Sequence, residues 1–326
     1  MGDLEKSLGS TLRNFLDPSI ACSFGSMESP VLIAFDYKSF HVLTLGFEAK
    51  DPLYMRMARL DMHSFFALVG LLRLEPEDKL EALADDELTS MFKFYRSSDR
   101  QFTEYAGMNF EEIRNEKAKR AILGIGFGQG EFSLARLNPE SFAGPADARK
   151  VLDRLNGLFP KPENWRTEIK MKADVEHKLV SRHGYVRYFW DVVQRKPVEE
   201  GYAPRGNERV WVHRESGQRW LLKPGDDAEA AIAFLPANDA FGTIRQVMIR
   251  LGEQGLDEKY GLINQIHDAL VFDCKRSLSE ECISVVREEM EQANQVLTDP
   301  EVAPEGLACK VEVKTGMNLA EMRKVA

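Results

Sequence analysis

The sequence predicts an α+β chain of two domains, with strands near both ends and a mainly helical middle. Its 326 residues are more than the ~100–200 residues of one typical domain. The apolar segment VLIAFDY at 31–37 is rich in β-branched residues, which predicts a buried strand. The segments GLINQI and ALVFDC flank His267-Asp268, which predicts a hairpin with a two-residue tip. Most of the intervening sequence has apolar residues at helical spacing.

The remaining elements follow from the same signals. Asn109 is a candidate N-cap, with acids in the first turn of a helix that ends in a series of glycines. Further helices are expected from apolar periodicity over 40–47, 61–95 with a break at 75–78, 146–180, 226–254 and 279–297. Short strands with hairpins are expected over 181–224, and a final strand near 308–314.

Composition narrows the class of protein. Apolar residues make up 44% and charged residues 29%, as in an ordinary globular chain. No apolar run approaches the ~20 residues of a membrane span, and the N-terminus lacks the apolar core of a secretory signal. The four cysteines form no CxxC pair and are interpreted as reduced thiols. We therefore expect a cytoplasmic protein without a membrane partner.

Net charge does not decide the binding partner. The chain carries −9, which argues against nucleic acid. Two acidic segments, 75–87 and 280–301, each hold seven acids and one basic residue, so the remainder is net positive. Residues 178–223 carry ten Lys or Arg against five acids. A basic face that binds nucleic acid is therefore compatible with the acidic total.

Two aspartates are the first candidates for chemistry. Asp36 and Asp268 each lie on or beside an apolar strand, where an ionised carboxylate is costly unless it is paired or binds a cation. The simpler interpretation is an exposed strand end and a hairpin turn, where aspartate is common. If the two converge, carboxylate and carbonyl oxygens suit Mg²⁺, and two such ions support phosphoryl transfer.

A helix stripe is the second candidate. Lys119, Leu123 and Phe127 recur at i, i+4 and i+8, so they share one helix face that could bind a phosphate, a sugar and a base. The alternative is a solvated basic edge with a core-facing Leu/Phe stripe. The neighbouring glycines match neither a P-loop nor GxGxxG. Asp61 is most simply an N-cap, and His63 is more simply a surface histidine than a ligand.

Three segments, in order, resemble motifs A, B and C of the family A DNA polymerases, the DNA polymerase I type. They are DYKSFHVLTLGF with LDMHSFFA, RNEKAKRAILGIGFGQG, and INQIHDALVFDC. The glycine-rich form of motif B is most similar to phage-encoded members, which implies host cytoplasm as the location. Weaker matches are SRHGYVRYF and LPANDAFGTIRQVMIRL. The resemblance spans about residues 31–314.

The resemblance implies a right-hand polymerase fold, with an antiparallel-sheet palm and a mainly helical fingers insertion. The palm would comprise 31–60 and 236–326, after a lead-in of 1–30. The fingers would comprise 61–235, with a β-hairpin region at about 181–224. The family's thumb and exonuclease domains precede motif A, where this sequence has ~30 residues. We therefore expect a split polymerase, in which a second chain supplies the thumb, the exonuclease domain or both.

The resemblance also implies roles for individual positions. Asp36 and Asp268 would be catalytic and, with the Tyr37 carbonyl, would hold two Mg²⁺ ions, for which Mn²⁺ can substitute. The residues implied to bind the incoming dNTP are His41, His63, Arg114, Lys119, Leu123 and Phe127. The residues implied to bind primer-template DNA are Arg187, Asn238, Gln265 and His267.

Four departures from the family pattern matter. His41 replaces the glutamate that usually blocks a ribose 2′-hydroxyl, and Ala269 replaces the acid that usually follows the motif C aspartate. Leu123 replaces an aromatic residue. Arg114 lies five residues before Lys119 instead of four, which would rotate it by about 100° around an α-helix.

The predicted function is template-directed DNA synthesis by two-metal-ion transfer of a deoxynucleotide to a primer 3′-hydroxyl. Two alternatives remain open. One is a weakly active or idle structural subunit of a replication complex, which the missing acid and the missing thumb favour. The other is a polymerase with relaxed sugar selection that makes or extends RNA, which His41 favours.

Overall fold

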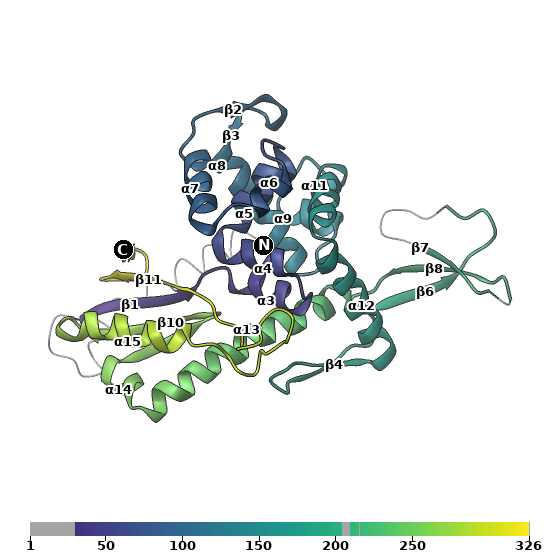
Figure 1. Ribbon diagram of the computed structural model, residues 1–326. Coiled ribbons are helices and arrows are strands. Elements are labelled where there is room, and N and C mark those ends of the chain that lie inside the picture. Colours follow the sequence, from purple (N-terminus) through teal and green to yellow (C-terminus); the bar gives the residue numbers. More distant parts are fainter. Residues whose placement is uncertain (1–29, 204–208, 215, 326) are drawn as a thin grey trace. The chain divides into compact units, whose positions relative to one another are not determined.

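The computed structural model describes residues 30–203, 209–214 and 216–325 (Figure 1). The chain divides into two compact units. Unit 1 comprises residues up to Phe40 and from Ala240 onward, and unit 2 comprises His41–Asp239. The chain passes from one unit to the other at the start of α3 (Phe40–Glu48) and within α13 (Ala228–Glu253). The predicted lead-in up to residue 29, and Cys22 within it, lie outside the described residues.

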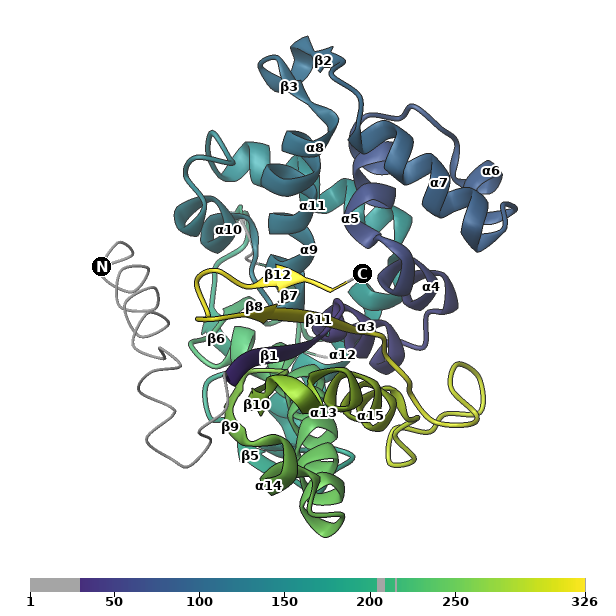
Figure 2. The same ribbon diagram turned by 90° about the vertical axis from the view of Figure 1, so that its left-hand side faces the viewer.

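Unit 1 is built on an antiparallel sheet with the strand order β12-β11-β1-β10-β9, which Figure 2 shows nearly edge-on. Its strands are β1 (Pro30–Tyr37), β9 (Leu262–Ile266), β10 (Ala269–Lys275), β11 (Val311–Gly316) and β12 (Arg323–Lys324). The helices of this unit, apart from the segment of α13, are α14 (Leu256–Tyr260), the short 3₁₀ helix η5 (Arg276–Leu278) and α15 (Ser279–Glu291).

The centre of the sheet is apolar on both faces. Leu32, Ile33 and Phe35 of β1 are fully buried, which explains why this strand is a continuous apolar run and not an alternating one. The rings of Phe35 and Phe272 meet edge to face, with centroids 5.4 Å apart. Helix α15 packs against β1, β10 and β11. The chain therefore holds the end of β1 in a well-packed layer.

Unit 2 is mainly helical around its own core. Its helices, besides α3 and the start of α13, are α4 (Pro52–Leu60), α5 (Met62–Phe65), the π-helix η2 (Phe66–Leu71), α6 (Glu77–Glu81), α7 (Asp85–Arg96), the 3₁₀ helix η3 (Thr103–Tyr105), α8 (Phe110–Ile113), the π-helix η4 (Arg114–Ala118), α9 (Lys119–Gly126), α10 (Glu131–Leu137), α11 (Pro145–Leu158) and α12 (Pro160–Glu176). The predicted N-cap is confirmed, because the Asn109 side chain accepts a hydrogen bond from the Glu112 amide at 3.0 Å.

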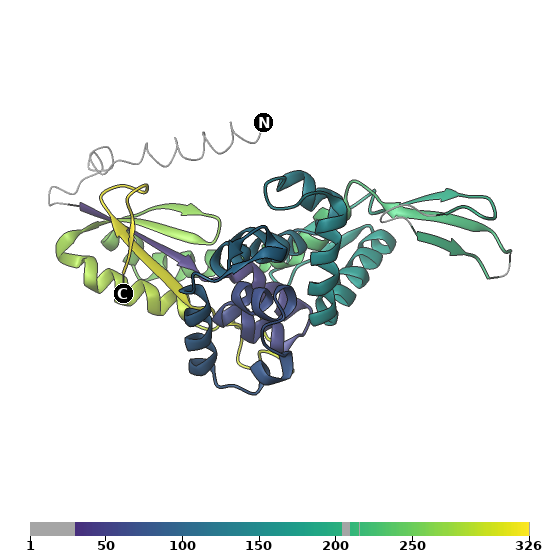
Figure 3. The same ribbon diagram turned by 90° about the horizontal axis from the view of Figure 1, so that it is seen from above.

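The described residues of unit 2 also form three small antiparallel sheets. They are formed by β2 (Gln101–Phe102) with β3 (Met108–Asn109), by β4 (Lys178–Val180) with β5 (Val186–Tyr188), and by β6 (Val193–Pro197), β8 (Arg219–Pro224) and β7 (Arg209–Val212) in that order. The three-stranded sheet extends away from the helices of its own unit (Figure 3). Short strands with hairpins were predicted over 181–224, and the structure confirms them.

Two predicted helices differ from the structure. The helix expected over 146–180 is two helices, α11 and α12. Phe159 precedes Pro160 and leaves the helical conformation, with φ −125° and ψ 76°, because a following proline disfavours that conformation. Strand β4 then begins at Lys178. The helix expected over 279–297 ends at Glu291, and the last six residues of that range continue outside it. The other predicted helices and strands are present within a few residues.

Within the described ranges, no helix combines the length and the apolar character needed to cross a bilayer. Cys274, Cys282 and Cys309 are free thiols and are buried.

Candidate functional site

The sheet of unit 1 brings the two predicted catalytic aspartates together. Asp36 is the penultimate residue of β1, and Asp268 lies in the two-residue turn between β9 and β10. His267, the other turn residue, has φ 55°, the left-handed conformation that such tight hairpins require. Because β1 pairs with β10 up to Asp36 and Ala269, the end of β1 lies beside this turn. The tertiary contact that the sequence could not prove is therefore present.

A third carboxylate lies in the same row of the sheet. Asp36 is directly opposite Ala269 on one side and Glu312 of β11 on the other. Residues directly opposite each other in antiparallel strands project to the same face. The acid that is absent at Ala269 thus has a counterpart at Glu312. Sequence reasoning missed Glu312, although it expected a strand near 308–314.

Burial and mutual repulsion set the charge of the two aspartates. The pKa of Asp268 is raised, first by burial and then by the negative charge of Asp36. Burial also raises the pKa of Asp36. The positive charge of Lys314 opposes this effect, and the negative charge of Glu312 adds to it. Two carboxylates that repel each other beside a backbone carbonyl form the oxygen donor set that Mg²⁺ prefers. The donor chemistry therefore fits a divalent cation.

The geometry around these aspartates is not a closed metal cage. No cluster of three or more His, Cys, Asp or Glu side chains suited to a metal ion occurs in the part of the chain that the structure describes. Glu312 instead forms ion pairs with Lys324 at 2.6 Å and with Lys314 at 3.3 Å. The Tyr37 phenol is buried and donates to the Met290 carbonyl at 2.6 Å. This side-chain anchor leaves only the Tyr37 backbone carbonyl for a metal.

In unit 2, a π-helical turn corrects the expected rotation of Arg114. The amide of Lys119 donates to the Arg114 carbonyl, an i→i+5 hydrogen bond within η4, between α8 and α9. In such a turn, residues five apart lie one above the other, as residues four apart do in an α-helix. The extra residue between Arg114 and Lys119 is absorbed there, so the expected rotation by about 100° is wrong. Consistent with this, both cations lower the pKa of His63.

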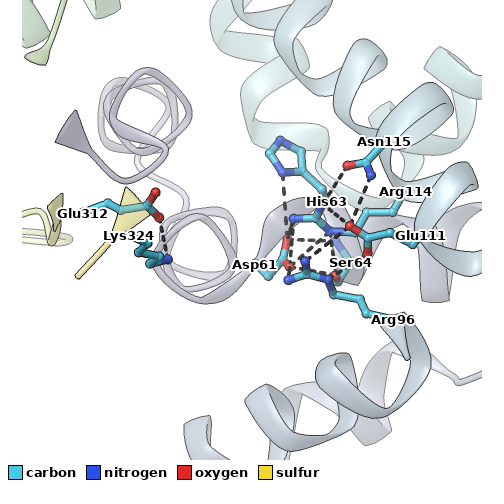
Figure 4. A network of polar contacts seen from close by, with 9 residues as sticks. All are labelled: Asp61, His63, Ser64, Arg96, Glu111, Arg114, Asn115, Glu312 and Lys324. Carbon is cyan, nitrogen blue, oxygen red and sulfur yellow. Dashed lines mark hydrogen bonds and ion pairs between the residues drawn. The ribbon is translucent and has the colours of Figure 1, made fainter. Parts of the chain in front are cut away.

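Arg114 is the centre of a polar network, which Figure 4 shows together with the separate Glu312–Lys324 pair. Its guanidinium donates to Asp61 from two nitrogens at 3.0–3.2 Å and to the Ser64 hydroxyl at 3.0 Å. It also donates to Asn115 at 2.8 Å and to Glu111 at 3.4 Å. In this conformation a phosphate would have to replace one of these acceptors. The phosphate role of Arg114 stays a prediction.

Asp61 joins this network to the start of a helix. Its side chain accepts from the Ser64 amide at 3.1 Å, so the predicted N-cap of α5 is confirmed. Burial raises the pKa of Asp61, but the charge and hydrogen bonds of Arg114, with those of Ser64, outweigh burial and hold it below its ordinary value. Asp61 is therefore ionised and opposite a cation at neutral pH.

His63 is a buried residue, so the interpretation as a surface histidine is wrong. Its side chain is 12% exposed and its Nδ1 lies 3.9 Å from Asp61. The pKa of His63 is lowered to about 4, mainly by burial, with smaller contributions from the charges of Arg114 and Lys119 and an opposing effect of Asp61. The imidazole is therefore neutral at pH 7. Any contact that it makes with a nucleotide is a hydrogen bond and not a charge pair.

Lys119 differs from the other cations of its helix. Arg114 is bound in the network, Lys117 pairs with Asp147 at 3.0 Å, and Arg120 lies 4.0 Å from Glu116. Lys119 is exposed, and its ammonium has no hydrogen bond or ion pair with any residue that the structure describes. A long cation held on a rigid helix without a partner is available to an anionic ligand.

The stripe that begins at Lys119 faces solvent and not the core. Leu123 is partly buried and Phe127 is 47% exposed. The alternative of a core-facing Leu/Phe stripe is therefore wrong. Phe127 is the C-cap of α9, and its amide donates to the carbonyls of Leu123 and Gly124 at 3.1 Å. The end of this helix is thus ordered while its aromatic side chain remains accessible.

His41 packs against the end of the same helix. Its ring stacks on Phe127 with centroids 4.6 Å apart and planes 15° apart, and its Nε2 lies 3.1 Å from the Gly126 carbonyl. A Cβ at Gly126 would lie 3.0 Å from two imidazole atoms, so any larger residue there would push the His41 ring away by a few tenths of an ångström. Burial lowers the pKa of His41, so the ring is neutral at pH 7. The structure joins two segments that are more than 80 residues apart in sequence.

The four predicted DNA-binding residues lie on three separate features. Arg187 is exposed on β5, with its guanidinium 5.2 Å above the Phe189 ring. Asn238 lies on α13, and its amide donates to the Phe234 carbonyl at 2.8 Å. Gln265 lies near the end of β9, and its side-chain amide donates to the carbonyl of His267, which is exposed at the tip of the β9–β10 hairpin. Their DNA contacts stay predictions.

A buried carboxylate next to Asn238 was missed by sequence reasoning. Asp239 is fully buried in α13. Burial, followed by the charge and a hydrogen bond of Glu48, raises the pKa of Asp239 to about 9, with an opposing effect of Arg182. Arg182 donates to Glu48 at 3.1 Å. Nothing in the local sequence identified Asp239 as buried, because its partners come from α3 and from the segment after β4.

Comparisons with known proteins give one kind of match. The sequence matches no protein-family description and no curated protein. Among solved structures, the chain is similar to the POL domain of Pol1 from M. smegmatis in complex with DNA primer-template and dNTP. That similarity has a TM-score of 0.55 at 16% sequence identity, and it covers 90% of this chain and 41% of that chain. The predicted α+β class with an antiparallel sheet is confirmed, and the fold is similar to that polymerase domain.

Replacing Asp61 with alanine is expected to destabilise the protein by about 3 kcal/mol, because it removes a helix cap and leaves the Arg114 cation without its main partner in a poorly solvated site. Urea unfolding followed by circular dichroism measures the change. Asp85→Ala is the control, since it breaks an exposed pair with Arg56 at 2.8 Å and should cost under about 1 kcal/mol. Equal losses in both variants would contradict a structural role for the network.

Asp239 predicts a loss of stability as pH rises. The folded state keeps a proton on this carboxyl up to a pKa of about 9, whereas an unfolded aspartate loses it near 3.8. Folding therefore takes up one proton between these values, and the free energy of unfolding falls by up to about 1.4 kcal/mol per pH unit. Asp239→Asn, which mimics the neutral form, should remove this slope between pH 5.5 and 8.5. The exposed Asp226→Asn should keep it, and an unchanged slope in Asp239→Asn would refute the assignment.

Proposed function

We propose that this chain catalyses template-directed DNA synthesis, the transfer of a deoxynucleotide from a dNTP to a primer 3′-hydroxyl. One observation carries the proposal: Asp36 and Asp268, 232 residues apart in sequence, are neighbours at one end of the sheet in a chain with a polymerase-domain fold. The interpretation of these aspartates as an ordinary strand end and turn does not account for a repelling pair that raises the pKa of Asp268.

The residues that would hold the metal ions are Asp36, Asp268 and the Tyr37 carbonyl. Two Mg²⁺ ions, or Mn²⁺ in their place, would supply Lewis-acid activation of the 3′-hydroxyl and stabilise the charge that develops on phosphate oxygens. The protein orients these oxygen ligands through the strand pairing of β1 and the turn of the β9–β10 hairpin. Glu312 lies beside Asp36, and it would have to exchange its ion pairs with Lys314 and Lys324 to add a third negative charge to the metal site.

In the proposed reaction, helix α9 and its neighbours bind the dNTP. Lys119 pairs with the triphosphate, because its ammonium is exposed and unoccupied by described residues. Leu123 and Phe127 offer an accessible apolar surface, one helical turn apart, for sugar and base. His63, which is neutral, would contact the nucleotide through a hydrogen bond. Arg114 would donate to a phosphate oxygen in place of one of the acceptors of its network. Arg187, Asn238, Gln265 and His267 are the proposed contacts to primer-template DNA.

We propose that this chain discriminates less strongly against ribonucleotides than polymerases that have a glutamate at the position of His41. His41 is neutral, stacked on Phe127 and close to the Gly126 carbonyl, so it presents no negative charge to a ribose 2′-hydroxyl. This arrangement favours a second candidate function, in which the chain also incorporates NTPs. A direct comparison of dNTP and NTP incorporation by the same preparation decides between the two.

The alternative of an idle structural subunit is less well supported than catalysis. Within the site, the main observation in favour of an idle subunit was the missing acid at Ala269. Glu312 is an acid on the other side of Asp36 in the same row of the sheet, which weakens that observation. The need for a second chain that supplies thumb or exonuclease functions stays a prediction. A primer-extension assay with and without a candidate partner chain tests it.

Asp36→Asn and Asp268→Asn are each expected to reduce primer extension by about 10³-fold or more, because each removes a charged metal ligand worth several kcal/mol of transition-state stabilisation. Incorporation of a single dNTP into a primer-template, with Mg²⁺ and with Mn²⁺, is the measurement. Glu280→Gln, an exposed acid of the same unit, is the matched control and should keep full activity. Circular dichroism should show an intact fold in all three. Normal incorporation by either aspartate variant would defeat the proposal.

Lys119→Ala is expected to weaken dNTP use by about 10- to 100-fold in kcat/KM, since it removes one charge-assisted contact to the triphosphate. Steady-state incorporation at varied dNTP concentration measures the effect, and Lys119→Arg should recover part of it. Lys93→Ala removes an equally exposed cation from α7 and should change little. If Lys119→Ala and Lys93→Ala behave alike, Lys119 does not bind the nucleotide.

A further inference from the structure

Three aromatic rings stand parallel on the surface of unit 2. We call His177, Tyr188 and Trp190 the ring stack. The rings of His177 and Trp190 are 5.5 Å apart with planes 24° apart, and those of Tyr188 and Trp190 are 6.2 Å apart with planes 8° apart. Trp190 is 74% exposed and Tyr188 is 60% exposed. Such large exposed aromatic surface is unfavourable in water and usually indicates a binding site.

The backbone beneath the ring stack is fixed. Phe189, between Tyr188 and Trp190, is fully buried and meets the Phe234 ring edge to face. Because successive side chains of an extended segment alternate, this anchor directs Tyr188 and Trp190 outward. The Phe189 amide donates to the His177 carbonyl at 2.9 Å, and the Trp190 amide donates to Asp227 at 2.8 Å. The rings are therefore held in place before any ligand binds.

The segment that carries the ring stack is rich in cations, and one of them lies beside the rings. Lys178 is directly opposite Tyr188 in the β4–β5 pair, so the two side chains share one face. Arg187 precedes Tyr188 on β5 and lies over the Phe189 ring, on the other face. Both cations are exposed, and neither forms an ion pair with a residue that the structure describes. Residues 170–196 carry seven Lys or Arg against three acids, a net charge of +4, in a chain of net −9. Of those acids, Asp174 is already paired with Arg195, whereas Glu176 is exposed.

We propose that the ring stack binds single-stranded DNA, with bases stacked on Trp190 and Tyr188 and a phosphate beside Lys178. Flat aromatic faces with adjacent cations are the combination that binds unpaired bases without sequence preference. A protein-docking patch needs apolar area but does not require parallel rings, and it usually excludes lysine. The proposal rests on the proposed function only for the source of the strand, which would be unpaired template.

Fluorescence anisotropy with a labelled oligothymidylate of about 16 nucleotides tests this site on the full chain. The buffer contains EDTA and no dNTP, so the result is independent of catalysis. Trp190→Leu keeps apolar area but loses the flat face, and we expect it to weaken binding by about tenfold or more. Trp190→Phe should keep most of the affinity. Phe94→Leu, at a ring that is 68% exposed on α7, is the matched control and should bind like wild type.

Binding that weakens as salt increases supports the phosphate contact. The proposal is overturned if the wild-type chain does not bind the oligonucleotide, or if Trp190→Leu binds as tightly as wild type. It is also overturned if wild type instead self-associates through Trp190, as sedimentation would show, without binding DNA. Asp36→Asn should bind the oligonucleotide normally. Loss of extension with retained binding in that variant separates this site from the catalytic one.

Discussion

The function proposed for this chain depends on the position of β1 between β10 and β11. Seven consecutive residue pairs join β1 to β10, from Pro30 opposite Lys275 to Asp36 opposite Ala269. A slip of one residue would turn the Asp36 side chain to the other face of the sheet. The buried apolar residues of β1 resist such a slip, because they fit between packed layers. Core packing therefore fixes where the carboxylate lies and which charges, Asp268 and Glu312, surround it.

In unit 2, helix α9 presents the cation of Lys119, which has no ion pair with a described residue, and the exposed ring of Phe127. The π-turn of η4 absorbs the extra residue between Arg114 and Lys119. Asp61 and Glu111 form ion pairs with Arg114 of this turn and with Arg96 of α7. The charge of Arg114 is therefore already paired within the protein. Lys119 remains accessible on the next turn. The network and the ligand-binding stripe are thus neighbouring parts of one helix with distinct roles.

The sequence could predict features that are encoded locally. The apolar run of β1, the cap at Asn109 and the hairpin around His267 and Asp268 all depend on neighbouring residues, and the structure contains them. It could not predict contacts that depend on distant segments. Glu312 beside Asp36, the stacking of His41 on Phe127 and the buried Asp239 are of this kind. The π-turn was missed for another reason: an α-helical spacing was assumed where one inserted residue changes the hydrogen-bond pattern.

The central claim is that Asp36 and Asp268 together hold a divalent cation. Titration of the protein with Mn²⁺, followed by the electron paramagnetic resonance signal of the free ion, tests it without any assay of synthesis. Wild type should bind Mn²⁺ saturably, and Asp36→Asn and Asp268→Asn should each lose that binding while keeping their folded circular dichroism spectrum. Mn²⁺ binding that is absent from wild type, or unchanged in both variants, would contradict the account.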